Sequence, residues 1–131
     1  MYQVGRMRVL IVDDEATICR ALQIALTRAG YAVDTRETGE GALELLRSEP
    51  VDVLIVDLRI PDTRGDVLFE LAAATQPHLR HQTLFITGDA SARGMELVGA
   101  CGCPVLFKPF DLKELIEQTH HLVANVREAS A

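Results

Sequence analysis

Two identical runs of four apolar residues, each ending in an aspartate, constrain the fold of this chain more than any other feature. Val-Leu-Ile-Val occupies residues 9–12 and again residues 53–56, followed by Asp13 and by Asp57. An unbroken apolar run bounded by polar residues is typical of a strand buried on both faces, as in a parallel sheet. Asp57 would then lie at the carboxyl edge of the sheet, where open α/β folds bind ligands. Taken alone, such an aspartate more often only stabilises the next turn.

The rest of the chain alternates between strand and helix patterns. Short apolar stretches predict three more strands, at residues 31–35, 83–87 and 104–108. Apolar residues at helical spacing predict five helices, over residues 18–30, 39–48, 65–75, 91–100 and about 111–126. We expect only a polar tail after residue 126.

Two of these helices carry more specific predictions. In the helix at 65–75, we expect Val67, Leu68 and Leu71 to face the core. In the helix at 91–100, Gly94 and Gly99 each cost about 1 kcal/mol relative to alanine, so this helix is expected to be short or mobile.

Five strand-then-helix units in succession predict an α/β fold, a doubly wound parallel sheet with right-handed crossovers and helices on both faces. The chain has 131 residues, which suits a single domain over residues 1–131 with a core at about 7–126. No linker or repeat interrupts the pattern.

Charge and cysteine content exclude several classes of function. The formal net charge is −6, and no clustered positive face is present, which argues against a nucleic-acid partner. No signal peptide or long apolar span points to a membrane, so we expect a cytoplasmic protein. Cys101 and Cys103 lack the spacing of a redox or metal motif and are expected to be reduced, buried or half-buried thiols. His120 and His121 are adjacent on a helix, so their side chains diverge too far to share a metal.

Polar residues end four of the five predicted strands: Asp13 with Asp14, Asp57, Thr87 and Lys108. Because parallel strands that each lead into a helix end at one edge, these side chains should converge. Three carboxylates in close proximity repel one another unless they are protonated or bind a cation, and an all-oxygen site suits Mg²⁺. Lys108 and Thr87 supply the charge and the hydroxyl that a transferring phosphoryl group needs, and an aspartate can itself be the nucleophile.

These residues and their spacing resemble the receiver domain of two-component response regulators, the CheY-like superfamily, over about residues 7–126. The motifs that carry the resemblance are VLIVDDE at 9–15, DLRIPDTRG at 57–65, FITGD at 85–89 and FKPFD at 107–111. The resemblance implies a flavodoxin-like three-layer sandwich with strand order 2-1-3-4-5. It also implies phosphoryl transfer to Asp57 from a sensor histidine kinase or a histidine phosphotransfer protein. Such a domain catalyses only its own phosphorylation and dephosphorylation and is not otherwise an enzyme.

The same resemblance implies a metal site. Asp57 would be the phosphoacceptor and a ligand of Mg²⁺, Asp14 a direct ligand, and Asp13 a ligand mainly through water. The main-chain carbonyl of Arg59 would complete the protein ligands.

The resemblance further implies a switch. Thr87 would bind the phosphoryl group and shift toward it, Lys108 would form an ion pair with it, and the Lys108–Pro109 peptide bond would be cis. Where the family often carries Tyr or Phe, this chain has Val105, which cannot report the switch by rotation of a ring.

Family resemblance also points to a docking surface for the phosphodonor. It would lie beside the active edge, where Ile18 comes near Pro109 and Phe110. The pattern alone is equally compatible with Ile18 as a core residue. Pairing of two copies of the chain stays open as a further interaction.

Arg59 and Asp89 lie two residues after the acceptor and two residues after Thr87. Our hypothesis is that they pair across the mouth of the site and slow hydrolysis of the acyl phosphate. The alternative is that both are solvated charges with no such role.

Two other functions compete with a phosphoryl-accepting receiver. An aspartate-nucleophile phosphatase would normally carry Asp-x-Asp after its first strand, whereas this chain has adjacent Asp13 and Asp14. A degenerate receiver that acts only as a protein-interaction module would not need all five site side chains. The sequence is compatible with a stand-alone regulator and with one domain of a larger protein.

Overall fold

The structure, a computed structural model, describes residues 6–130, and for residues 125–130 it describes the backbone alone. Its elements in chain order are β1 (Arg8–Val12), α1 (Ala16–Arg28), β2 (Ala32–Arg36), α2 (Gly39–Ser48), β3 (Val53–Asp57), β4 (Arg59–Ile60), β5 (Thr63–Arg64), α3 (Gly65–Thr75), the 3₁₀ helix η1 (Pro77–His81), β6 (Thr83–Thr87), α4 (Ala92–Cys101), β7 (Val105–Phe107) and α5 (Leu112–Ser130).

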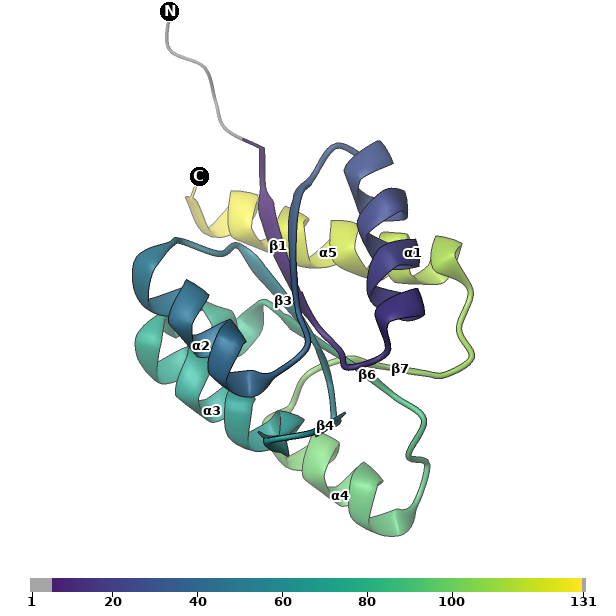
Figure 1. The fold of residues 1–131 in the computed structure, drawn as a ribbon. Helices are drawn as coiled ribbons and strands as arrows, with labels where there is room; N and C mark the ends of the chain where they lie inside the picture. The colour runs from purple at the N-terminus through teal and green to yellow at the C-terminus, as the bar shows by residue number, and fades with distance from the viewer. Residues whose placement is uncertain (1–5, 131) are drawn as a thin grey trace, which may run out of the picture.

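Five of the strands form one parallel sheet in the order β2-β1-β3-β6-β7. Counted along the chain, these are the first to fifth strands of the sheet, so the predicted order 2-1-3-4-5 is confirmed. Helices α1 and α5 cover one face, and α2, α3 and α4 cover the other (Figure 1). The molecule is therefore the predicted doubly wound, three-layer α/β sandwich.

The two Val-Leu-Ile-Val runs form the central strands, and all eight of their side chains are fully buried. Alternation along the strand divides them between two cores. In β1, Leu10 and Val12 pack with α2, α3 and α4, whereas Val9 and Ile11 pack with α1 and α5. A strand buried on both faces needs apolar residues at every position, which explains why these runs do not alternate.

The prediction for the inward face of α3 is partly wrong. Leu68 is buried as expected, but Val67 is 39% exposed and Leu71 is 46% exposed. Phe69 and Ala72 take the inward positions instead, and the Phe69 ring packs on that of Phe85. The helix carries apolar residues on nearly every side, so their spacing did not single out the face that packs.

The end of the last helix also needs correction. The backbone of α5 stays helical to Ser130, four residues past the predicted end at about residue 126. Helix α4 has ten residues, the length predicted, and is capped at its N-terminus by the Ser91 hydroxyl, which accepts from the Gly94 N–H; that this helix is mobile stays a prediction.

The sequence patterns missed a small antiparallel ribbon formed by β4 and β5, directly after the central strand. Its strands have two residues each, and Pro61 and Asp62 form the turn between them. Elements this short leave no periodic pattern. The ribbon lies beside the carboxyl edge of the sheet, and so it becomes part of the candidate site.

Among the helices of residues 6–130, none combines the length and the apolar character that crossing a membrane would require.

Candidate functional site

The carboxyl ends of the sheet strands bring the predicted site residues to one edge. Strands β1 and β3 pair in register to their ends, so Asp13 and Asp57 leave neighbouring strands side by side. Lys108 directly follows β7, and its main-chain N–H donates to the carbonyl of Thr87 at 2.8 Å. The convergence predicted from the strand ends is therefore what the fold produces.

Lys108 is the cationic centre of the site. Its Nζ lies 2.7 Å from Asp57 Oδ2, 2.8 Å from Glu15 Oε1 and 2.9 Å from Asp13 Oδ2. Burial lowers the pKa of Lys108, but its bonds to Asp57, Glu15 and Asp13 outweigh this effect and hold the pKa above its usual range. Lys108 therefore stays charged and neutralises part of the acidic cluster.

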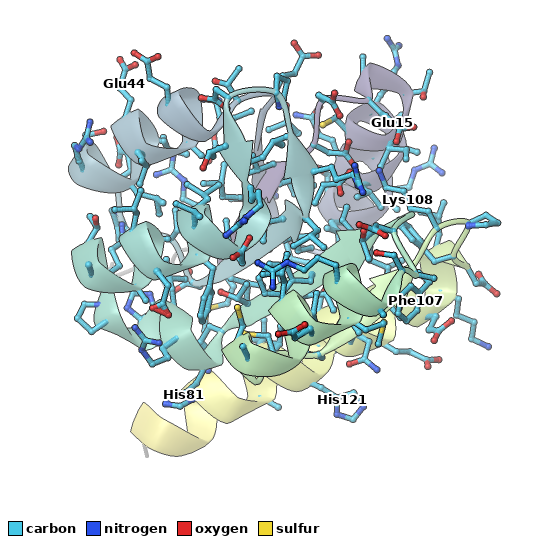
Figure 2. The ribbon with its side chains drawn as sticks, turned by 90° about the horizontal axis from the view of Figure 1, so that it is seen from below. Glu15, Glu44, His81, Phe107, Lys108 and His121 are labelled. Atoms are coloured by element: carbon cyan, nitrogen blue, oxygen red, sulfur yellow. The ribbon has the colours of Figure 1, made fainter. Side chains whose placement is uncertain are left out.

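Glu15 is a site residue that the sequence patterns did not identify. It follows the Asp13–Asp14 pair and is about half exposed, with its carboxylate on the ammonium of Lys108, 93 residues away (Figure 2). The third acid in a row was the available signal, but no local rule pairs it with a lysine at the other end of the chain.

The three aspartates form an all-oxygen cluster. Asp13, Asp14 and Asp57 each offer a carboxylate oxygen within 4.8 Å of the others. Asp13 is fully buried and Asp57 is 4% exposed, whereas Asp14 is exposed. Burial raises the pKa of Asp13, and the ammonium of Lys108 opposes this rise.

One oxygen of this cluster is only partly satisfied. Asp13 Oδ2 is buried, and it forms an ion pair with Lys108 Nζ at 2.9 Å but accepts no hydrogen bond of acceptable geometry from the described residues. Lys108 shares its single charge among three carboxylates, so this buried oxygen would gain from a further cation. The donor set is made of carboxylates open to solvent on one side, which fits a hard divalent cation such as Mg²⁺.

Asp57 is held at both of its carboxylate oxygens. Oδ2 accepts from Lys108, and Oδ1 accepts from the main-chain N–H of Arg59 at 3.0 Å. Arg59, whose carbonyl the resemblance implies as a ligand, is the first residue of β4. The ribbon therefore places its backbone directly against the acceptor.

Thr87 ends β6 at the same edge and is 1% exposed. Its Oγ1 accepts the main-chain N–H of Asp89 at 2.9 Å. Val105, at the position of the usual aromatic residue, is half-buried against the core shared by α2, α3 and α4. The Lys108–Pro109 peptide bond is cis, as the resemblance implied.

A hollow of about 380 Å³ opens over the site, and its lining includes Asp14, Glu15, Asp57, Arg59, Asp89 and Lys108. Thr87 is not part of this lining. Across the mouth, the Arg59 guanidinium donates to Asp89 Oδ2 from Nη2 at 2.8 Å and from Nε at 3.2 Å. The predicted Arg59–Asp89 pair is confirmed, and hydrogen bonds from Ser91 and Arg59 hold the pKa of Asp89 at about 2.

The residues predicted for docking have mixed environments. Ile18 and Phe110 are half-buried and pack against the core under α1 and α5, whereas Pro109 is exposed. Both interpretations of Ile18, core and surface, therefore hold in part. Cys101 and Cys103 are half-buried free thiols, as predicted, and Cys19 is a buried free thiol.

Comparison with known proteins gives consistent matches. The family model for the response regulator receiver domain matches residues 9–120. The transcriptional regulatory protein KdpE of Mycobacterium tuberculosis is 39% identical over 125 residues, which are 94% of this chain and 52% of KdpE. The response regulator receiver protein CpdR of Brucella abortus is 32% identical over 117 residues, which are 88% of this chain and 96% of CpdR.

Among solved structures, a CheY-like receiver domain protein of Methanospirillum hungatei superposes with a TM-score of 0.85 at 26% identity, covering 95% of this chain and 99% of that one. The chain thus spans about half the length of KdpE and nearly all of CpdR.

Proposed function

The chain belongs to the response regulator receiver domain family, and from this premise we propose that it accepts a phosphoryl group on Asp57 in a Mg²⁺-dependent two-component phosphorelay. The donor would be a sensor histidine kinase or a histidine phosphotransfer protein. The observation that supports this most directly is the position of Asp57, nearly buried beside Lys108 and two more aspartates, below an open hollow.

In this proposal, a carboxylate oxygen of Asp57 attacks the phosphorus atom of a phosphohistidine. An O–P bond forms as the P–N bond breaks, and the imidazole leaves with the electron pair of that bond. Lys108 neutralises charge on the phosphoryl oxygens as they approach Asp57.

The metal in this proposal would be held by Asp13, Asp14, Asp57 and the carbonyl of Arg59. Bound Mg²⁺ would supply positive charge to the phosphoryl oxygens during transfer. Without it, Lys108 is the only cation in contact with Asp57 among the described residues, so the site keeps a net negative charge that would repel a phosphodonor.

The switch in this proposal begins at Thr87. Its hydroxyl accepts from the Asp89 N–H and keeps its own proton to donate to a phosphoryl oxygen. Val105 is too short to swing as an aromatic ring would, so we propose that output depends on small changes in its packing.

Ile18, Pro109 and Phe110 would form part of the surface that receives the donor. The proposed compartment is the cytosol, where free thiols persist.

The test is phosphorylation with acetyl phosphate and Mg²⁺, followed by intact-mass measurement. We expect the wild-type chain to gain about 80 Da, the mass of one phosphoryl group, and Asp57→Asn to gain nothing. Asp66→Asn, which changes a half-buried aspartate that pairs with Arg64 and not with the site, should keep the adduct.

An adduct that persists in Asp57→Asn would overturn the assignment of the acceptor. A wild-type chain that stays unmodified with every donor would favour the alternative function, a degenerate receiver that works only as a protein-interaction module.

A further inference from the structure

The turn of the β4–β5 ribbon is fastened to a helix far away in the sequence. The carboxylate of Asp62 accepts the main-chain N–H of Gly39 through Oδ1 at 2.8 Å and that of Glu40 through Oδ2 at 2.9 Å. Gly39 and Glu40 are the first two residues of α2, whose N–H groups have no partner within the helix. Asp62 thus caps α2 from a distant segment of the chain. Thr38, the residue directly before α2, caps the same helix locally, because its Oγ1 accepts the Gly41 N–H.

The ribbon and α2 also touch closely at this point. A Cβ atom added at Gly39 would lie 2.6 Å from Thr63 Cγ2, so any other residue at the helix start would force the Thr63 side chain to shift. Ile60, on the other strand of the ribbon, is buried in the core shared by α2, α3 and α4. The turn end of the ribbon is therefore held both by the Asp62 side chain and by Ile60 in the core.

The base of the ribbon leads directly to the phosphoryl acceptor. Arg59 begins β4, and its N–H donates to Asp57 Oδ1. At the other end of the ribbon, Gly65 N–H donates to the carbonyl of Leu58 at 2.7 Å. A Cβ atom at Gly65 would lie 2.3 Å from the carbonyl oxygen of Asp57, so the two ends of the ribbon enclose the acceptor tightly.

We propose that Asp62 is a positioning residue for the phosphoryl site: by holding the ribbon on the first turn of α2, it fixes the backbone of Arg59 against Asp57. This inference rests on the proposed function, because it assigns to Asp62 the placement of the Arg59 carbonyl as a metal ligand. Asp62 does not contact the site itself, and it acts through the ribbon. Groups that orient metal ligands in this way commonly change metal affinity when they are removed.

The test compares Asp62→Ala with Thr38→Ala. Both remove a cap from the first turn of α2, but only Asp62 joins the helix to the ribbon. Asp62→Asn is the rescue variant, because its single amide oxygen can still accept one of the two N–H groups. The readouts are the unfolding midpoint in urea, the amide hydrogen exchange rate of Arg59 in metal-free protein, and the Mg²⁺ dissociation constant from calorimetric titration.

We expect both alanine variants to unfold at lower urea concentrations than wild type. Only Asp62→Ala should speed exchange at Arg59 and weaken Mg²⁺ binding, by about tenfold, with Asp62→Asn intermediate. Equal effects of the two alanine variants on exchange and on Mg²⁺ affinity would overturn the positioning role, because Asp62 would then be only a helix cap. A wild-type protein that binds no Mg²⁺ and accepts no phosphoryl group would overturn the proposed function and this inference with it.

Discussion

At the residue scale, the acidic cluster is incompletely neutralised. One ammonium, that of Lys108, lies within 3 Å of the carboxylates of Asp13, Glu15 and Asp57, while Asp14 lies exposed beside them. One ammonium cannot satisfy every oxygen of the cluster, and the buried Asp13 Oδ2 has its ion pair with Lys108 but accepts no hydrogen bond of acceptable geometry from the described residues. This excess of negative charge is the physical reason to expect a cation there.

Arg59 gives the first prediction at this scale. If its pair with Asp89 screens the acyl phosphate from attacking water, Arg59→Ala should raise the rate of autodephosphorylation, by about two- to fivefold because exposed ion pairs contribute little. The measurement is the loss of the phosphoryl adduct with time after the donor is removed. Arg64→Ala, on the neighbouring strand of the ribbon and paired with Asp66, is the control and should leave the rate unchanged. An unchanged rate in Arg59→Ala would mean that the Arg59–Asp89 pair does not protect the acyl phosphate from hydrolysis.

Cys103 gives a pH-dependent prediction. Burial raises the pKa of its thiol to about 12, above the ordinary 9.0. The neutral thiol is therefore favoured by folding: this contribution to stability is fully present below about pH 9 and is lost as the pH rises through 12. Because the thiolate is the reactive form, we expect alkylation by iodoacetamide at pH 8 to be at least about tenfold slower in folded than in urea-unfolded protein. Equal rates, measured by mass spectrometry of the Cys103 peptide, would contradict this burial.

At the element scale, α4 shows that two glycines in one helix can have different roles. A Cβ atom at Gly94 would lie 2.8 Å from the carbonyl oxygen of Asp89, so this glycine lets the helix pack on the loop that carries the Arg59 partner. A Cβ atom at Gly99 would meet nothing within 4 Å. The helix forms at full length despite both, because Val98 anchors it in the core.

These two glycines give a paired prediction about stability. Gly99→Ala should stabilise the protein by about 0.5–1 kcal/mol, because alanine is the better helix former and the site is open. Gly94→Ala should destabilise it by about 1–3 kcal/mol, because the backbone of Asp89 would have to move. Urea unfolding measures both. Equal shifts in the same direction would mean that helix propensity alone governs α4.

At the scale of the whole molecule, the proposed metal site would link folding to Mg²⁺ binding through the carboxyl edge of the sheet. Residues from β1, β3 and the ribbon come together there only when the sheet has formed, so a cation that binds them stabilises the folded state. At a Mg²⁺ concentration 100 times the dissociation constant, the free energy of unfolding should rise by about 2.7 kcal/mol.

Asp13→Asn tests this linkage. At the same Mg²⁺ concentration, the rise in the free energy of unfolding that Mg²⁺ produces should be smaller by about 1.4 kcal/mol for every tenfold loss of Mg²⁺ affinity. Metal-free Asp13→Asn should be at least as stable as wild type at pH 7, because burial raises the pKa of Asp13 and so disfavours its charged form. Urea unfolding with and without Mg²⁺ separates the two effects. If Mg²⁺ stabilises the variant as much as it stabilises wild type, Asp13 is not a metal ligand.

The sequence by itself determined the sheet and the ends of its strands. Apolar runs buried on both faces identify central strands without reference to anything distant, and the polar residue that ends each run falls at the same edge in any parallel sheet. Asp13, Asp57, Thr87 and Lys108 were predictable for this reason, since strand length and direction place them.

Only the tertiary structure decided which groups meet across long separations and which helix faces are covered. Glu15 on Lys108 and Asp62 on Gly39 join segments that no local pattern connects. The exposure of Val67 and Leu71 depends on where neighbouring helices lie, because α3 is apolar on nearly every side. Local periodicity records the conformation of a segment, whereas packing and hydrogen bonds between segments depend on the positions of both in space.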